Sequence, residues 1–407
     1  MIRIKDKTNK LSKLISPRHD INNPIYNWFS FKHSFSKDLV IYLTKQFNLT
    51  HNSWVLDPFC GGGTTLLACK DSGINAFGVD ILPFSVFLSY AKIINYDINK
   101  IRSILLDFKE NKKSLIKKYE IKDIVIIKKA FSEKIILEIL KIKSFVDNLK
   151  GKEKNFFKLG LLSILESVSK TSKSGGFLRI VNKKIKYTQV RRIFIDKVEI
   201  MVSDLEKNTI IENKNIPIIK VYYKDARKLN FKQKFDAVIT SPPYPNRHDY
   251  TRVYSLEMIF DGINTNEELK EIRYNSIRSH VEARKRYRTK TYIEDELLTN
   301  LIKKMDINGF NNPQLKEMLK GYFEDMHIVI ERIYSMLKPK GKIAMVVSNV
   351  RFSGISIPVD IILAKIGENI GLKIKSIYLI RNRGNSSQQM KTYKRKTSRE
   401  SIIIWEK

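Results

Sequence analysis

The chain has 407 residues, a length that is large for one domain and suits a core domain carrying insertions. Lys and Arg number 75 against 42 Asp and Glu, so the formal charge is +33, and this surplus favours a polyanionic partner. With only two cysteines, a disulfide framework is not expected. The sequence has no apolar run long enough to span a bilayer and no apolar segment after Met1, which argues against a membrane span and a signal peptide. These features fit a cytoplasmic protein.

The first hundred residues show an α/β pattern. A helix is expected over residues 37–47, with Ser36 as its N-cap. An apolar strand over 53–56 leads into a Gly-rich turn, which is followed by a helix over 64–70 and by a second strand that ends at Asp80. The order strand, Gly turn, helix, strand is typical of a doubly wound α/β sheet.

The α/β alternation stops at about residue 98 and resumes at about residue 215. Between these points the sequence is basic and mostly helical, with helices expected over 101–118 and 132–149 and a Gly-containing loop over 172–176. We interpret residues 98–214 as an insertion.

The second half of the chain contains further strands and a second basic stretch over 261–312. The catalytic domain is therefore expected to combine residues 1–97, 215–260 and 313–407. Its later elements are strands over 217–222 and 235–240, a helix over 314–337, a turn over 339–341, and strands over 342–347, 374–380 and 401–405.

The Gly-rich turn has the sequence Asp57-Pro-Phe-Cys-Gly-Gly-Gly-Thr-Thr65. Glycines let a ligand approach the backbone, and the following helix offers free N–H groups. The turn is not a P-loop, because no Lys-Ser/Thr follows, and its consecutive glycines do not match the dinucleotide fingerprint. Asp80, at the end of the second strand, is placed to accept from two ribose hydroxyls, and Asp225, after the third strand, from an adenine amino group.

This turn resembles motif I of the amino-methyltransferases that act on DNA, and residues 28–39 resemble their motif X. The resemblance implies a Rossmann-like, seven-stranded mixed sheet with helices on both faces, here with mainly helical insertions. It also implies S-adenosylmethionine (AdoMet) as cofactor. The residues implied in its binding are Asp57, Phe59, Gly61, Gly63, Asp80, Ile81, Asp225, Ala226, Phe35 and Ser36.

The catalytic loop of that family resembles Ser241-Pro242-Pro243-Tyr244 of this chain. A base amine is a poor nucleophile because its lone pair is delocalised, so it needs positioning and two acceptors for its N–H bonds. The Ser241 hydroxyl and the Pro242 carbonyl are the expected acceptors, and Tyr244 is expected to stack on a base flipped out of the duplex. By itself, the tetrapeptide is more typical of a rigid surface turn. Its position after a strand, downstream of the Gly-rich turn and the two acids, favours the catalytic loop.

The first residue of this loop bears on the target base. Within the family, Ser at that position is associated with cytosine-N4 enzymes and Asp with adenine-N6 enzymes. The resemblance therefore implies a site-specific cytosine-N4 methyltransferase, with adenine-N6 methylation as the alternative. Cytosine-C5 chemistry would need a Pro-Cys nucleophile, and neither Cys60 nor Cys69 follows a proline.

Duplex DNA is the expected partner, together with a cognate restriction endonuclease acting on the same site, since such enzymes occur in restriction–modification systems. Residues 98–214 are a candidate target-recognition region, and 261–312 a candidate DNA-contact region. The residues expected to contact DNA, each of which is equally compatible with a solvated surface charge, are Arg247, Arg252, Arg284, Arg286, Arg288 and Arg383.

Two other functions are compatible with parts of the pattern. RNA amino-methyltransferases share the Asp-Pro-Phe-Cys-Gly turn, but they typically carry Asp-Pro-Pro-Tyr and an N-terminal RNA-binding domain, for which the stretch before Asp57 is too short. A non-catalytic DNA-binding protein with a retained methyltransferase fold is disfavoured by the complete set of motif residues. The histidines show no metal-ligand spacing, so no metal is expected.

Overall fold

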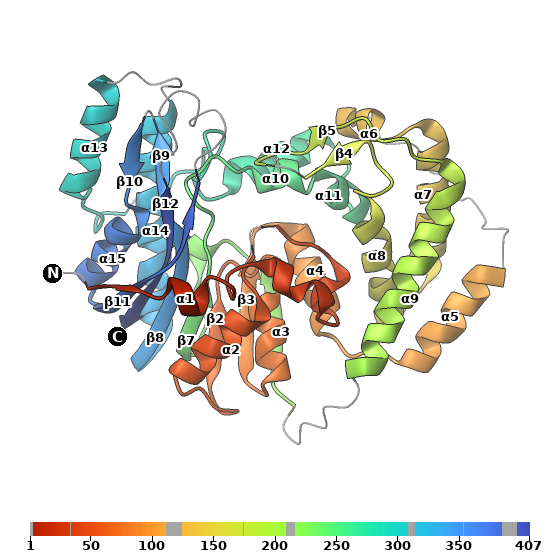
Figure 1. The fold of residues 1–407 in the computed structure, drawn as a ribbon, viewed down its shortest axis with the longest axis horizontal. Helices are drawn as coiled ribbons and strands as arrows, with labels where there is room; N and C mark the ends of the chain where they lie inside the picture. Colours follow the sequence, from red (N-terminus) through yellow and green to blue (C-terminus); the bar gives the residue numbers. More distant parts are fainter. Residues whose placement is uncertain are drawn as a thin grey trace.

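The computed structural model describes residues 3–32, 34–110, 124–173, 175–208, 216–287, 289–307, 312, 314–352, 354–384 and 397–407. Its centre is an eight-stranded mixed sheet (Figure 1). In spatial order the strands are β1 (Ile4–Asp6), β11 (Lys373–Arg383), β12 (Ser398–Glu406), β8 (Leu337–Ser348), β7 (Phe235–Thr240), β2 (Trp54–Asp57), β3 (Asn75–Asp80) and β6 (Ile219–Tyr223).

The sheet thus has eight strands where seven were predicted. The seven from β11 to β6 include every predicted strand, and β12 is antiparallel to both of its neighbours. The additional strand, β1, pairs in parallel with β11, with Ile4 opposite Ile377. The sequence Ile-Lys-Asp has no apolar face, so backbone pairing at the sheet edge determines this strand, and periodicity does not predict it.

Helices cover both faces of the sheet, as predicted. In β8, Ile343, Met345 and Val347 point into one core with α14 (Gln314–Met336) and α15 (Val359–Ile370). The alternate residues Ala344 and Val346 point into a second core, with α1 (Thr8–Leu11), α2 (Lys37–Gln46) and α3 (Thr64–Asp71). This period of two is what a strand buried on both faces requires.

Ser36 does not cap α2 as predicted. It occupies the N-cap position, but its side chain makes no capping bond, and its hydroxyl donates to the Leu14 carbonyl instead. The Asp20 carboxylate accepts from Lys37 N at 3.1 Å in its place. A residue distant in sequence thus satisfies the helix N-terminus.

The stretch predicted as the first insertion forms a helical bundle beside the sheet (Figure 1). Its helices pack in one core with Trp28, Phe84 and the other apolar side chains around α4 (Pro83–Ile93). The prediction of helices is correct here, although residues 111–118 lie outside the described residues. The elements are α5 (Ile98–Glu110), α6 (Val125–Ala130), α7 (Glu133–Asn148), α8 (Gly151–Ile164), the hairpin β4 (Thr171–Ser172) and β5 (Arg179–Ile180), and α9 (Val190–Asn208).

The chain after β7 crosses between these two parts. In Figure 1, α10 (Tyr250–Val253), α11 (Ser255–Asp261) and α12 (Asn266–Asn275) pass over the ends of the sheet strands, and α13 (Glu296–Ile307) lies beside β10 (Ile355–Ile357). The short strands β9 (Val350–Phe352) and β10 form a separate hairpin. Within the described residues, no helix is long and apolar enough to cross a membrane.

Candidate active site

A cavity opens where the parallel strands β2, β3, β6 and β7 end, and residues from all four strand ends line it. Ser241 and Pro243 of the predicted catalytic loop lie in the same lining. The predicted cofactor residues that line it are Asp57, Phe59, Gly61, Asp80, Ile81, Asp225, Ala226 and Phe35. The structure therefore brings together two predicted sites that are far apart in the sequence.

The glycine turn is held against the end of β3. Gly61 N donates to Asp80 Oδ2 at 2.9 Å, and Cys60 N donates to the Val79 carbonyl at 2.9 Å. Gly63 lies behind the turn rather than in the lining: its φ is +78°, and a Cβ there would lie 3.0 Å from Ser89 Cα. Its role is therefore close packing of the turn on α4.

Asp57 and Asp80 are carboxylates in a low-dielectric site. Asp57 accepts from Thr240 Oγ1 at 2.7 Å, which ties β2 to the residue that precedes Ser241. Asp80 accepts from Gly61 N and, at 2.9 Å, from Leu82 N. Burial raises the pKa of each carboxyl to about 6, because it disfavours the charged form.

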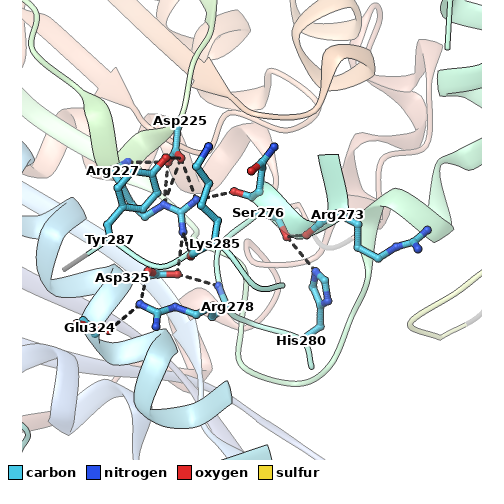
Figure 2. Close-up of polar contacts among 11 residues, drawn as sticks. Asp225, Arg227, Arg273, Ser276, Arg278, His280, Lys285, Tyr287, Glu324 and Asp325 are labelled. Atoms are coloured by element: carbon cyan, nitrogen blue, oxygen red, sulfur yellow. Dashed lines mark hydrogen bonds and ion pairs between the residues drawn. The ribbon is translucent and has the colours of Figure 1, made fainter. Parts of the chain in front are cut away.

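Asp225 lies in a buried polar network (Figure 2). It accepts from Arg227 Nη2 at 2.9 Å and from the Tyr287 hydroxyl at 3.1 Å. Arg227 also donates to Asp325 Oδ2 at 3.0 Å, and Asp325 accepts from Arg278 Nη2 at 2.6 Å. The acid predicted to meet the adenine ring is thus oriented by an arginine that the same network fixes.

Arg227 also holds the two ends of the segment 276–284. Its guanidinium donates to the carbonyl of Asn275 and, at 3.5 Å, to that of Lys285. Four residues of this segment form a wall of the cavity: Ser276, Ile277, Ser279 and His280. Sequence reasoning missed this wall, since only the adjacency of Arg227 to Asp225 hints at it.

His280 is the one titratable side chain that the segment contributes to the lining. Its Nε2 lies 3.0 Å from Ser276 Oγ, as Figure 2 shows, and it is 5% exposed. Burial lowers its pKa, with the carboxylates of Asp249 and Glu282 opposing this effect. The imidazole is accordingly neutral at pH 7.

The predicted catalytic loop follows β7, and its hydroxyl groups form a chain of hydrogen bonds. Ser241 Oγ donates to the Tyr244 hydroxyl at 3.3 Å, and that hydroxyl donates to Glu400 Oε1 at 3.2 Å. Tyr244 also lines a small adjoining cavity with Ser34 and Phe35. Pro242 is buried, outside the lining of the main cavity.

The N-terminal segment closes one side of the cavity. Phe35 lines it as predicted, whereas Ser36 is fully buried and lies outside the lining. Two further residues of this segment were missed by sequence reasoning. Phe31 lines the cavity and stacks on Tyr254 with ring centroids 4.6 Å apart. Ser34 lies 3.0 Å from Thr64, oxygen to oxygen.

Comparison with known proteins identifies relatives of this chain. Residues 14–90 match a family model described as DNA methylase. The type II methyltransferase M.BsoBI of Geobacillus stearothermophilus is 33% identical over 100% of this chain and 90% of its own length. M.AvaI of a Nostoc species is 30% identical over 97% of this chain and 89% of its own length, and M.MjaII of Methanocaldococcus jannaschii is 41% identical over 21% and 16%.

This chain belongs to the DNA amino-methyltransferase family. Membership implies an AdoMet-type methyl donor, and the cavity suits one. Asp57 and Asp80 are buried acids, and among the described residues neither has an ion-pair partner. Such a pair favours a ligand that carries positive charge, as a sulfonium does, and Gly61 lets the ligand approach the backbone.

The methyltransferase presents some of the predicted DNA-contact arginines on its surface. Arg247 and Arg284 are exposed, and Arg286 is 67% exposed. Arg252 is 49% exposed and pairs with Glu282 and, at 3.3 Å, with Asp249. Arg288 and the side chain of Arg383 lie outside the described residues.

Two of the arginines predicted to contact DNA interact with residues around the site. Arg247 N donates to the Ser279 carbonyl at 3.1 Å, which joins the residues after the predicted catalytic loop to the 276–284 segment. The Arg284 guanidinium lies 4.6 Å from the Tyr274 ring centroid. Among the described residues of the methyltransferase, no group of three or more His, Cys, Asp or Glu is arranged to hold a metal ion.

Proposed function

We propose that this methyltransferase transfers the methyl group of AdoMet to the exocyclic N4 amine of a cytosine flipped out of duplex DNA. One observation carries the proposal: Ser241 and Pro243 line the same cavity as Asp57 and Asp80. The Ser241 hydroxyl, one of the two proposed amine acceptors, and a site for a cationic cofactor thus lie side by side. Ser at the first position of the catalytic loop, where adenine-N6 relatives tend to have Asp, favours cytosine.

The cofactor supplies a strongly electrophilic methyl group, so the protein has to position the amine. The Ser241 hydroxyl and the Pro242 carbonyl accept the two amine N–H bonds and restore lone-pair character to the nitrogen. Prolines at 242 and 243 remove two backbone donors that would compete for these acceptors. The Tyr244 ring is placed beside them to stack on the flipped base.

The cofactor residues divide the binding work. Asp80 accepts from the ribose hydroxyls, and Asp225 accepts from the adenine amino group while Arg227 holds it in orientation. Phe59, Ile81 and Phe35 supply apolar contacts to the ring and the methionine chain. Gly61 places its backbone at the ligand, whereas Gly63, Ala226 and Ser36 support the walls.

The proposed partner is duplex DNA, in a restriction–modification system with a cognate endonuclease. The support is the basic surplus of the chain and the fact that its relatives are named type II methyltransferases. Residues 98–214 are the proposed target-recognition region. Residues 261–312 and the exposed arginines are the proposed contacts to the DNA backbone.

Incubation of the protein with labelled AdoMet and duplex DNA, followed by nucleoside mass spectrometry, tests the proposal. N4-methylcytosine is expected. N6-methyladenine would contradict the choice of base and leave the reaction class intact, and label on RNA alone would contradict the DNA substrate. Asp80→Ala should weaken AdoMet binding, whereas Tyr244→Ala should lose turnover and still bind AdoMet.

A further inference from the structure

Glu400 lies at the catalytic loop although it comes from the last strand of the sheet. It is 2% exposed on β12, directly opposite Arg381 of β11. Arg381 donates to Glu400 Oε2 from Nε at 2.9 Å and from Nη2 at 2.7 Å. Two bonds from one guanidinium fix the orientation of this carboxylate.

The second carboxylate oxygen continues into the active site. Glu400 Oε1 accepts from the Tyr244 hydroxyl at 3.2 Å, and that hydroxyl accepts from Ser241 Oγ at 3.3 Å. An ionised carboxylate can only accept, so Tyr244 has to donate to it. The Tyr244 oxygen is then left to accept, which commits the one hydroxyl hydrogen of Ser241 to Tyr244.

The direction of these hydrogen bonds determines how Ser241 can meet the substrate. With its hydrogen committed to Tyr244, Ser241 meets the substrate only through its oxygen lone pairs. A hydroxyl that is free to rotate would also offer its hydrogen to the amine nitrogen, where it would compete with methyl transfer for the lone pair. A fixed hydrogen prevents that competition.

We propose that Glu400, held by Arg381, is a positioning residue that acts through Tyr244 to make Ser241 an obligate hydrogen-bond acceptor. The proposal rests on the proposed role of Ser241 in binding the target amine. It assigns a function to the closing strand pair β11–β12, which the catalytic motifs do not include.

The same chain of hydroxyls gives the amine proton a route. After transfer, the methylated nitrogen is cationic and loses one N–H proton to Ser241 Oγ. Ser241 passes its own proton to Tyr244, and Tyr244 passes its own to Glu400 Oε1. One proton thereby moves from the nitrogen to the carboxylate, no electrons change hands, and the base product is neutral.

Glu400→Gln tests the direction of these hydrogen bonds, because an amide of the same shape has one oxygen and one NH2 group. Arg381 only donates, so it takes the amide oxygen and turns the NH2 group toward Tyr244. Tyr244 then accepts from Gln and donates to Ser241, which reverses the chain. The single-turnover rate of methyl transfer is expected to fall about tenfold to a hundredfold, with the Kd values for AdoMet and DNA unchanged.

A double variant separates this role from a structural one. Tyr244→Phe keeps the ring and removes the linking hydroxyl, so Glu400→Gln should have no further effect on the rate in a Tyr244→Phe background. Asp360→Asn is the matched control. Asp360 is a fully buried carboxylate that Arg399 of β12 holds at 2.9 Å, and none of its hydrogen bonds within the described residues reaches the catalytic loop.

The expected outcome is a slow Glu400→Gln variant, an Asp360→Asn variant with the wild-type rate, and no additivity with Tyr244→Phe. A Glu400→Gln variant with the wild-type rate overturns the proposal, as does an equal loss in the Tyr244→Phe background. A wild-type protein that methylates no base, or an active Ser241→Ala variant, would instead contradict the proposed function.

Discussion

Arg227 and Asp325 form an ion pair at 3.0 Å in which both side chains are fully buried. The pair connects the residue that orients Asp225 to helix α14, and Asp325 also accepts from Arg278 of the 276–284 segment. One carboxylate thus compensates two arginines that hold different walls of the cofactor cavity. The stability of the fold and the shape of the site depend on the same contact.

Asp325→Asn should therefore destabilise the protein and weaken AdoMet binding together. Removing the Asp325 charge leaves Arg227 paired with Asp225 alone and Arg278 with Glu324 alone. Breaking a buried ion pair costs up to about 3–5 kcal/mol in the free energy of unfolding. Urea denaturation and calorimetric AdoMet titration measure the two effects. Glu317→Gln, on the same helix, is the control, since Glu317 and Arg286 are 65% and 67% exposed and their pair contributes below about 1 kcal/mol. Similar small losses in both variants would contradict the role of Asp325.

AdoMet affinity should rise with pH through about 6. Burial raises the pKa of Asp57 and Asp80 to about 6, and only the ionised forms attract a cationic ligand. As pH rises toward that value from below, Kd should fall by up to about tenfold per pH unit for each carboxyl that ionises on binding. Asp80→Asn should reduce this slope in calorimetric titrations from about pH 5 to 8, and a Kd that is independent of pH would contradict the expectation.

The stability of the ligand-free protein should instead fall as pH rises through about 6. Both folded-state pKa values lie above the value of about 3.9 of the unfolded chain, so the folded protein binds more protons between about pH 4 and 6. The contribution of these two groups to the free energy of unfolding is therefore largest below about pH 4 and declines as pH rises through about 6. Asp57→Asn should make the thermal midpoint, measured by calorimetry, fall less steeply over this range.

Gly63→Ala should destabilise the protein although Gly63 does not line the cavity. Its φ of +78° disfavours any side chain, and the new Cβ would lie 2.9 Å from Ser89 Oγ and 3.0 Å from Ser89 Cα. Gly175 is the matched control, because its φ is +86° and a Cβ added there would meet no atom of the described residues within 4 Å. Gly175→Ala should cost about 1–2 kcal/mol of strain, and Gly63→Ala about 1–3 kcal/mol more, by denaturant unfolding. An equal loss of stability in the two variants would show that Ser89 moves aside without a cost in free energy.

Local sequence predicts the parts of the site that strand ends position. Asp57, Asp80 and Asp225 each follow a short apolar strand, and parallel strands bring their carboxyl ends to one edge of the sheet. Ser241 follows a strand in the same way. Their meeting in one cavity therefore follows from the α/β pattern and requires no long-range information.

Contacts between segments that are distant in the sequence cannot be predicted from strand patterns. Glu400 reaches Tyr244 over 156 residues of sequence, through an antiparallel strand inserted between β8 and β11. The sequence of β12 is typical of a buried strand, and no neighbouring residue indicates that Glu400 contacts the catalytic loop. The cavity wall formed by Ser276 and His280 is also not predictable from local sequence. It is held by the hydrogen bond from Arg227 to the Asn275 carbonyl, which joins segments far apart in the chain.

DNA binding should depend steeply on salt, and two arginines should account for part of the slope. Arg284 ends the 276–284 segment, whose first residues line the cavity, and Arg286 follows two residues later. Both are exposed, so phosphates bound there would lie beside the cavity. Each phosphate contact removed should reduce the slope of log K against log salt by about 1, with little change in sequence preference. Fluorescence anisotropy over a salt series measures Arg284→Ala and Arg286→Ala. Lys375→Ala, on β11 and 43% exposed beside Glu406, is the control that should leave the slope unchanged. Equal slopes in all three variants would place the DNA on another surface.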